Sequence, residues 1–101
     1  MDEVSSFIDE YGAATIFAFE MIDELDEIHI GKMAYVNGLM LNNRGVNVPQ
    51  FVIIEEHDTC KILKFVLAGD VSKHSDFIYM NISVGFFERK HEYLGMSVNN
   101  V

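Results

Sequence analysis

The sequence predicts an α+β fold in which one long N-terminal amphipathic helix packs on an antiparallel, curved sheet of five or six short strands. Apolar residues recur every three or four positions over about residues 3–27, which is the period of one helix face. From about residue 32 to residue 98, short apolar runs alternate with turn-forming residues, a pattern typical of strands. Because 50% of its 101 residues are hydrophobic, the chain is expected to form a single domain over residues 1–101.

The predicted helix over about residues 3–27 separates apolar from acidic side chains. Its apolar stripe consists of Val4, Phe7, Tyr11, Ala14, Ala18, Met21, Leu25 and Ile28. The opposite, acidic face consists of Asp9, Glu20, Asp23, Glu24 and Glu27, with Glu10 at its edge. Gly12 costs about 1 kcal/mol relative to Ala inside a helix, and the stretch 15–19 is β-branched and aromatic enough to suit a short strand or a break between two helices. Ile16 and Phe17 point away from the stripe, so they are either covered by another element or exposed for a partner.

The first turn signal after this helix is Asn37-Gly38. It lies between the apolar runs 33–36 and 39–41. Asn-Gly between two apolar runs is the strongest short-range indication of a β-hairpin, because both residues tolerate the backbone angles of a tight turn. The sequence therefore predicts two strands joined by a tight turn at this point.

The rest of the chain is also expected to form strands. The runs 51–56 and 60–67 lie on either side of a polar tip and predict a second hairpin. Apolar residues at every second position over 78–86 predict a half-buried strand. The segment 93–98 predicts a final strand that is interrupted by Gly95.

The net charge of −9 lies entirely in the first quarter of the chain. Nine carboxylates and no Lys or Arg precede Lys32, whereas from that residue onward seven acids are balanced by seven bases. On the predicted helix, like-charge neighbours such as Glu20 and Glu24 each cost about 0.2–0.5 kcal/mol, and acids near its C-terminal end oppose the helix dipole. Such a face is either kept acidic to dock on a basic surface, kept acidic for solubility, or neutralised by bases on nearby strands. The candidate neutralising residues are Lys61, Lys64, Arg89 and Lys90.

The sequence contains no recognisable catalytic or cofactor-binding motif. It has no glycine-rich phosphate loop, no paired Cys or His at metal-ligand spacing and no nucleophile elbow. The local cluster from His57 to Cys60 would need a cleft to activate the thiolate, and a hairpin tip seldom provides one. We therefore expect no enzymatic activity, catalytic residue, cofactor or metal.

Composition also restricts location and ligands. No apolar run approaches the roughly 18–20 residues that span a bilayer, and the acidic start Met1-Asp2-Glu3 is unlike a signal peptide. We therefore expect a cytoplasmic protein that does not bind membranes. Cys60 is the only cysteine, so an internal disulfide is excluded. The acidic charge also argues against direct binding of nucleic acid, because affinity for phosphates depends on Lys and Arg.

These observations predict a small acidic protein-binding protein, an inhibitor or adaptor that docks its acidic helix face on a basic partner protein. The expected partner-binding residues are Asp9, Glu10, Glu20, Asp23, Glu24, Glu27, Ile16 and Phe17. A partner that handles nucleic acid fits this surface, because carboxylates can occupy a Lys- and Arg-lined groove where phosphates would sit. In size and charge the chain is similar to phage anti-defence proteins, immunity proteins and small secretion chaperones, although no motif supports the analogy.

Two alternatives from other classes stay open. A small-molecule-binding domain would hold its ligand in an apolar pocket between the helix and the curved sheet. The residues expected to line such a pocket are Tyr35, Phe77, Tyr79, Phe87 and the methionines. A homodimer, as in a small acidic chaperone, would pair the helix stripe or an uncovered strand edge of two copies.

Overall fold

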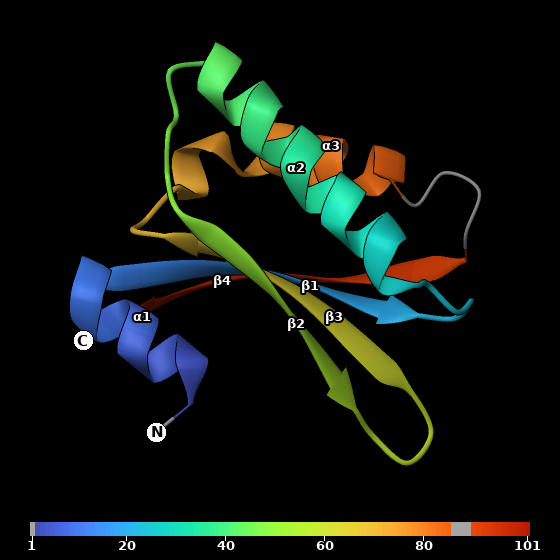
Figure 1. The fold of residues 1–101 in the computed structure, drawn as a ribbon. Helices are drawn as coiled ribbons and strands as arrows, with labels where there is room; N and C mark the ends of the chain where they lie inside the picture. The colour runs from blue at the N-terminus through green and yellow to red at the C-terminus, as the bar shows by residue number, and fades with distance from the viewer. Residues whose placement is uncertain (1, 86–89) are drawn as a thin grey trace.

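The computed structural model describes residues 2–85 and 90–101, which form one antiparallel sheet with helices on both faces. The strands are β1 Ala13–Met21, β2 Gln50–Glu56, β3 Lys61–Ala68 and β4 His91–Asn100, arranged in the order β2-β3-β1-β4. The helices are α1 Glu3–Tyr11, α2 Glu27–Asn43 and α3 Ser75–Gly85, the last preceded by a short 3-10 turn at Ser72–His74. α2 and α3 cover one face of the sheet, and α1 lies against the other (Figure 1).

The single helix expected over residues 3–27 is wrong, because this segment contains α1, β1 and the start of α2. α1 begins after Asp2, whose carboxylate accepts a 2.8 Å hydrogen bond from the backbone N–H of Ser5. It ends at Gly12, which has a φ of +84° and donates a 2.7 Å hydrogen bond to the carbonyl of Ile8. The β-branched and aromatic stretch that follows forms β1, with β3 and β4 on either side. A central strand that is buried on both faces carries a nearly continuous apolar run. Such a run also has apolar residues three and four positions apart, so in the sequence it resembles one face of a helix.

The hairpin expected at Asn37-Gly38 is also wrong, because both residues lie inside α2, a helix of 17 residues. Asp26 caps this helix by accepting a 2.6 Å hydrogen bond on Oδ1 from the backbone N–H of His29. Asn37 faces the core and has no exposed surface, so its side chain contributes to tertiary packing instead of a turn. α2 carries apolar residues on its outer as well as its inner side, and its sequence therefore shows no clear stripe.

The strand expected over 78–86 is wrong as far as the structure describes it, because α3 continues to residue 85; Phe86 lies outside the described residues. Ile78 and Ile82 lie one helical turn apart and are completely buried. Met80 and Val84 also lie one turn apart, but they are exposed on the other side. Apolar residues at every second position can therefore supply both an inner and an outer helix face, and a period of two does not exclude a helix.

The second predicted hairpin and the last predicted strand are confirmed. β2 and β3 pair antiparallel along their whole lengths. β4 pairs with β1 through a β-bulge next to Gly95, which lies opposite Ala18. The described residues form four strands instead of five or six, because three of the expected strands lie in α2 and α3.

The core lies between the sheet and the layer formed by α2 and α3. It contains Phe17, Phe19 and Phe65, which are completely buried. The ring centroid of Phe19 lies 6.2 Å from that of Phe65 and 5.0 Å from that of Tyr93. The order β1-α2-β2-β3-α3-β4 is the split β-α-β arrangement of ferredoxin-like folds, with α1 added before it.

The other side of the sheet, which we call the outer face, is covered by α1 at one end (Figure 1). The Phe7 ring of α1 lies 4.9 Å from the Phe51 ring of β2, and Ala14 and Val66 are completely buried nearby. Beyond α1, the outer face carries both charged and apolar side chains toward the end at which β1 stops. Among the described helices, none combines the length and the apolar character needed to cross a membrane.

Candidate functional site

The acidic residues expected to form one helix face lie on separate elements. α1 carries Asp9 and Glu10, β1 carries Glu20, the loop after β1 carries Asp23 and Glu24, and α2 begins with Glu27. β1 spans roughly 25 Å at about 3.3 Å per residue. The acids of α1 precede this strand, whereas Glu20 lies next to its last residue and the others follow it, so the two groups lie at opposite ends of the sheet. The expected continuous acidic helix face is therefore wrong.

Further carboxylates join those at the end of the sheet where β1 stops. The strand register places Glu55, Ile62, Glu20 and Glu92 in one row across β2, β3, β1 and β4. The hairpin between β2 and β3 adds two more acids at the same end, which lies on the right-hand side of Figure 1. We call this group the acidic end; it consists of Glu20, Asp23, Glu24, Asp26, Glu27, Glu55, Glu56, Asp58 and Glu92.

Two of the lysines expected to neutralise the acids make ion pairs at this end. Lys61 Nζ lies 3.0 Å from Glu24 Oε1 and 3.7 Å from Glu56 Oε1. Lys64 Nζ lies 2.8 Å from Glu55 Oε2. The hydrogen bond to Glu24 raises the pKa of Lys61, and the hydrogen bond from Lys64 lowers the pKa of Glu55. These contacts therefore favour the charged forms of Lys61 and Glu55.

The lysines neutralise the acidic end only in part. Its nine carboxylates are accompanied by three lysines, Lys61, Lys64 and Lys90, which leaves a surplus of six negative charges among the described residues. Arg89, the remaining base expected to neutralise it, lies outside the described residues. Glu20 and Glu92 lie directly opposite each other on adjacent strands. Like charges directly opposite each other destabilise a sheet, so fold stability does not explain this pair.

Cys60, directly before β3, does not have the environment of an activated nucleophile. Burial and then the negative charge of Glu20 raise the pKa of its thiol, which disfavours the thiolate. The side chain of His57 is directed elsewhere, with Nε2 lying 3.3 Å from Glu55 Oε1. The backbone N–H of His57 donates a 2.8 Å hydrogen bond to the carbonyl of Cys60, which closes the hairpin. Among the described residues, no group of three or more His, Cys, Asp or Glu is arranged to hold a metal ion.

A hollow of about 280 Å³ opens in the acidic end, between the loop after β1 and the tip of the β2–β3 hairpin. Its wall includes the exposed side chain of Ile22, the acids Asp23, Glu24 and Asp58, and Lys61, which is paired with Glu24. The backbone N–H of Lys90 donates a 3.1 Å hydrogen bond to Oδ2 of Asp23, which fixes that carboxylate at the rim. A Lys or Arg side chain of another molecule has an apolar stem and a cationic head, so it would contact Ile22 and the acids Asp23 and Asp58, whereas Glu24 is already paired with Lys61.

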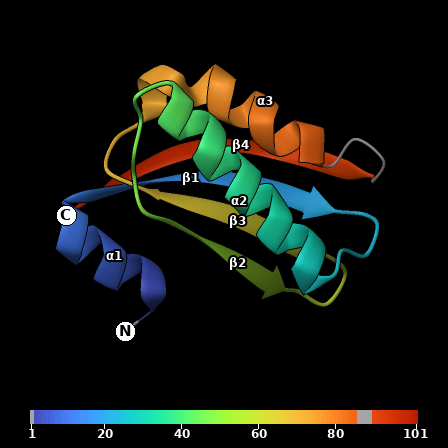
Figure 2. The same cartoon turned by 45° about the horizontal axis from the view of Figure 1, so that its top comes forward.

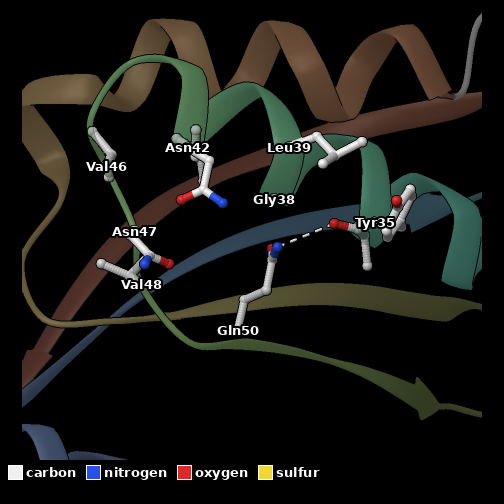
Figure 3. Close-up of a pocket in the computed structure, with 10 residues that line it drawn as sticks. Tyr35, Gly38, Leu39, Asn42, Val46, Asn47, Val48 and Gln50 are labelled. Atoms are coloured by element: carbon white, nitrogen blue, oxygen red, sulfur yellow. Dashed lines mark hydrogen bonds between the residues drawn. The ribbon is translucent and has the colours of Figure 1, made fainter.

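A second hollow, of about 270 Å³, lies between α2 and the segment that leads to β2 (Figure 3). Figure 3 shows Gln50 pointing toward α2, where its Nε2 donates a 3.1 Å hydrogen bond to the carbonyl of Ala34. Of the aromatic residues expected around a small-molecule pocket, Tyr35 lines this hollow, Phe77 and Tyr79 lie on α3, and Phe87 lies outside the described residues. The hollow is therefore a feature of one flank of α2, and the expected aromatic residues do not gather around it.

The two apolar residues expected to contact a partner point to opposite sides of β1. Phe17 has no exposed surface and belongs to the core, so its expected role is wrong. Ile16 is half-buried on the outer face.

The predicted partner-binding residues did not include five acids of the acidic end, namely Asp26, Glu55, Glu56, Asp58 and Glu92. The last four follow Lys32 in the sequence, where acids and bases are equal in number. The pairing of the β2–β3 hairpin with the end of β1 brings them together. This grouping of acids can be predicted only when residues 13–21 are recognised as a strand.

No family model and no curated protein matches the sequence. Among solved structures, the chain is similar to the de novo designed protein Ferredog-Diesel, with 12% sequence identity and a TM-score of 0.45. The match covers 87% of this chain and 84% of the designed one. A similarity of this degree has no bearing on function.

Proposed function

We propose that this protein is a protein-binding domain, an inhibitor or adaptor that docks its acidic end on a basic surface of a partner protein. The observation that carries this proposal is the convergence of nine carboxylates from separate segments, with three lysines among the described residues to offset them. A concentrated negative field accelerates encounter with a basic partner and disfavours acidic ones.

The opposition of Glu20 and Glu92 supports the proposal. Like charges placed directly across two strands oppose folding, and a basic side chain in place of either would remove the repulsion. Retaining both carboxylates is understandable if a cation from another molecule lies against them. The two carboxylates would then repel each other in the free protein and attract the cation of the partner in the complex.

The hollow beside Asp23 and Asp58 supplies a place for a single cationic side chain. Ile22 would contact the stem of a Lys or Arg, and Asp23 and Asp58 would pair with its charge, because Glu24 is already paired with Lys61 of the same wall. A partner that normally binds nucleic acid is a suitable class, because its surface already carries Lys and Arg spaced to meet phosphates.

The proposal is tested with two variants of equal charge change. Glu92→Lys removes a carboxylate of the acidic end and places a cation opposite Glu20, so it weakens binding without weakening the sheet. Glu10→Lys, on α1 at the other end of the sheet, is the matched control. Binding to an immobilised Lys- and Arg-rich peptide, and capture of partners from host lysate, are compared at low and high salt.

We expect the wild-type protein and Glu10→Lys to bind equally, and to lose binding as salt rises. Glu92→Lys is expected to bind several-fold more weakly at low salt. Equal losses in both variants would mean that only net charge matters, and would overturn the assignment to the acidic end. Binding that is unchanged in both variants, or insensitive to salt, would overturn the electrostatic mechanism itself.

A further inference from the structure

A third hollow lies within the helix layer, between the first turns of α2 and the last turns of α3. Its volume is about 220 Å³, and both helices contribute to its wall. Figure 2 shows the two helices side by side on one face of the sheet. This hollow therefore differs from the pocket predicted between a helix and the sheet, because it lies between two helices.

Apolar side chains form most of the wall of this hollow. Met33 is buried and belongs to the core, whereas Val36 and Val84 are exposed. A mainly apolar wall that contains a few polar groups is typical of sites for small molecules. Such sites usually measure about 300–1,000 Å³ for drug-sized ligands, so a hollow of this volume would take a smaller molecule.

One polar group of the wall lacks a hydrogen-bond partner. Asn81 lines the hollow from α3, and its Nδ2 is shielded from water but donates to no acceptor among the described residues. Buried donors of this kind are rare in folded proteins, and the missing acceptor is often a water molecule or a ligand. Because Asn81 forms part of the wall, turning its amide about the last side-chain bond can bring Nδ2 to an acceptor inside the hollow.

The charge of the wall comes from Lys32, and no acid lines the hollow. None of the ion pairs among the described residues involves Lys32. The residues one helical turn before and after it are also not acidic; they are Ile28, His29, Tyr35 and Val36. In a protein with a net charge of −9, this hollow thus offers a cation that no neighbouring carboxylate neutralises.

His29 fixes the two helices to each other at the hollow. Its Nε2 lies 2.9 Å from the carbonyl oxygen of Gly85, the last residue of α3. A carbonyl oxygen only accepts hydrogen bonds, so Nε2 is the donor. With Nε2 of His29 engaged in this way, Lys32 and Asn81 are the side chains that remain to bind the polar end of a ligand.

We propose that this hollow binds a small monocarboxylate with an apolar body, of the size of a short fatty acid. The apolar body packs against Met33, Val36 and Val84, while the carboxylate pairs with Lys32 and accepts a hydrogen bond from Asn81. Lys32 disfavours a cationic ligand, and a wholly apolar ligand leaves the Asn81 donor unpaired. The site thus takes ligands of the opposite charge to those proposed for the acidic end.

The proposal is tested with hexanoate, whose binding to the full chain is mapped by NMR from the shifts of backbone amides. Hexanol and hexylammonium have the same apolar chain with a neutral and a cationic head. We expect hexanoate to shift amides of residues 29–36 and 81–85, with a dissociation constant on the order of millimolar, because so small a ligand makes few contacts. At these amides, we expect hexanol to bind about threefold more weakly and hexylammonium more weakly still.

Two lysine variants separate a local charge from the net charge. Lys32→Met removes the cation but retains an apolar stem, and it is expected to weaken hexanoate binding about threefold without changing hexanol binding. Lys73→Met makes the same change at another exposed lysine, which precedes α3 and does not line the hollow. This control is expected to bind both ligands as the wild-type protein does.

Asn81→Leu tests the amide. This variant is expected to weaken hexanoate binding several-fold and to leave hexanol binding intact, because only the carboxylate uses the donor. It also removes an unpaired buried donor, so it should fold, which circular dichroism checks. A merely structural role of Asn81 would change the binding of both ligands equally and would overturn its assignment as a ligand-binding residue.

Three further results would overturn the proposed site. They are the absence of shifts at residues 81–85 with hexanoate on the order of tens of millimolar, equal affinities for hexanoate and hexanol, and equal losses in Lys32→Met and Lys73→Met. None of these measurements contains a basic partner. Failure of the carboxylate site would therefore leave the proposed function of the acidic end unaffected, and the reverse is also true.

Discussion

Asn37, in the middle of α2, donates a hydrogen bond of 2.8 Å from Nδ2 to Oε1 of Gln50 at the start of β2. Gln50 in turn donates from Nε2 to the carbonyl of Ala34, at 3.1 Å, so the helix and the strand are joined by two consecutive hydrogen bonds. Asn37 has no exposed surface, and its Oδ1 accepts no hydrogen bond from the described residues. The Nδ2 atom of the buried Asn37 amide thus has a hydrogen-bond partner, whereas its Oδ1 atom has none among the described residues. Gln50 therefore supplies the hydrogen bond that Asn37 makes in the core.

Replacing Gln50 with Leu is expected to lower the free energy of unfolding by about 1–3 kcal/mol, because Asn37 is then left buried with its donor also unpaired. Asn37→Leu is expected to cost less, since it removes the unpaired oxygen and Gln50 is near the surface. The double variant should cost less than the sum of the two. Urea unfolding of all four proteins, followed by circular dichroism, gives the coupling free energy. Effects that add within about 0.5 kcal/mol would show that the two amides do not act together.

Asn37 also explains why the hairpin that the sequence predicts within α2 is wrong. Asn37-Gly38 is a strong local signal for a turn, but the partner of Asn37 lies 13 residues further along the chain, and no local pattern reveals it. In α3, Ile78 and Ile82 face the core while Met80 and Val84 face outward, so an apolar helix presented the alternation of a strand. The second hairpin was predicted correctly because its strands and its tip are adjacent in the chain.

The glycines of α2 and α3 give a second prediction. A methyl group at Gly31 would meet nothing within 4 Å, so Gly31→Ala is expected to stabilise the protein by about 0.5–1 kcal/mol through the helix preference of Ala. A methyl group at Gly85 would overlap the side chain of Met33, which is buried, so Gly85→Ala is expected to destabilise. Thermal unfolding of the two variants measures both effects. Destabilisation by Gly31→Ala would contradict the placement of residue 31 inside a helix.

The N-terminus of α2 can be tested through Asp26, whose Oδ1 lies 2.6 Å from the backbone nitrogen of His29. Asp26→Ala removes this cap and is expected to cost about 1 kcal/mol. Asp26→Asn removes the same negative charge but retains an oxygen acceptor, so most of the stability should remain. Urea unfolding of both variants separates capping from charge. Equal losses would mean that the charge of Asp26, and not its hydrogen bond, supports the helix.

The acidic end was only half visible in the sequence, for a reason that differs from the errors in the helices. The count of acids before Lys32 identified Glu20 and its successors as a concentrated charge. Glu92 had no such signal, because it lies among bases in the sequence and meets Glu20 only through the pairing of β1 with β4. A count of charges along the sequence shows which segment has an excess of acids. The register of the strands decides which of those charges are neighbours in the structure.

The pair formed by Lys64 and Glu55 predicts how stability depends on pH. The hydrogen bond from Lys64 lowers the pKa of Glu55 in the folded protein below its ordinary value of 4.5. A folded-state pKa below the unfolded one means that the stabilisation is fully present above about pH 4.5 and is lost as the pH falls through the folded value. Because the Glu55 and Lys64 side chains are 38% and 28% exposed, solvent screening limits the contribution to less than about 1 kcal/mol.

Glu55→Gln should therefore lower the free energy of unfolding modestly at pH 7, and the difference from the wild-type protein should shrink as the pH falls below about 4.5. Urea unfolding at pH 7, 5, 4 and 3 measures this difference directly. Glu56→Gln is the matched control, because the Glu56 side chain is 74% exposed and lies at the longer distance of 3.7 Å from its lysine. It is expected to change stability little at any pH. A gap between Glu55→Gln and the wild-type protein that persists unchanged at pH 3 would show that the ion pair is not its origin, since a protonated Glu55 and a Gln differ little in charge.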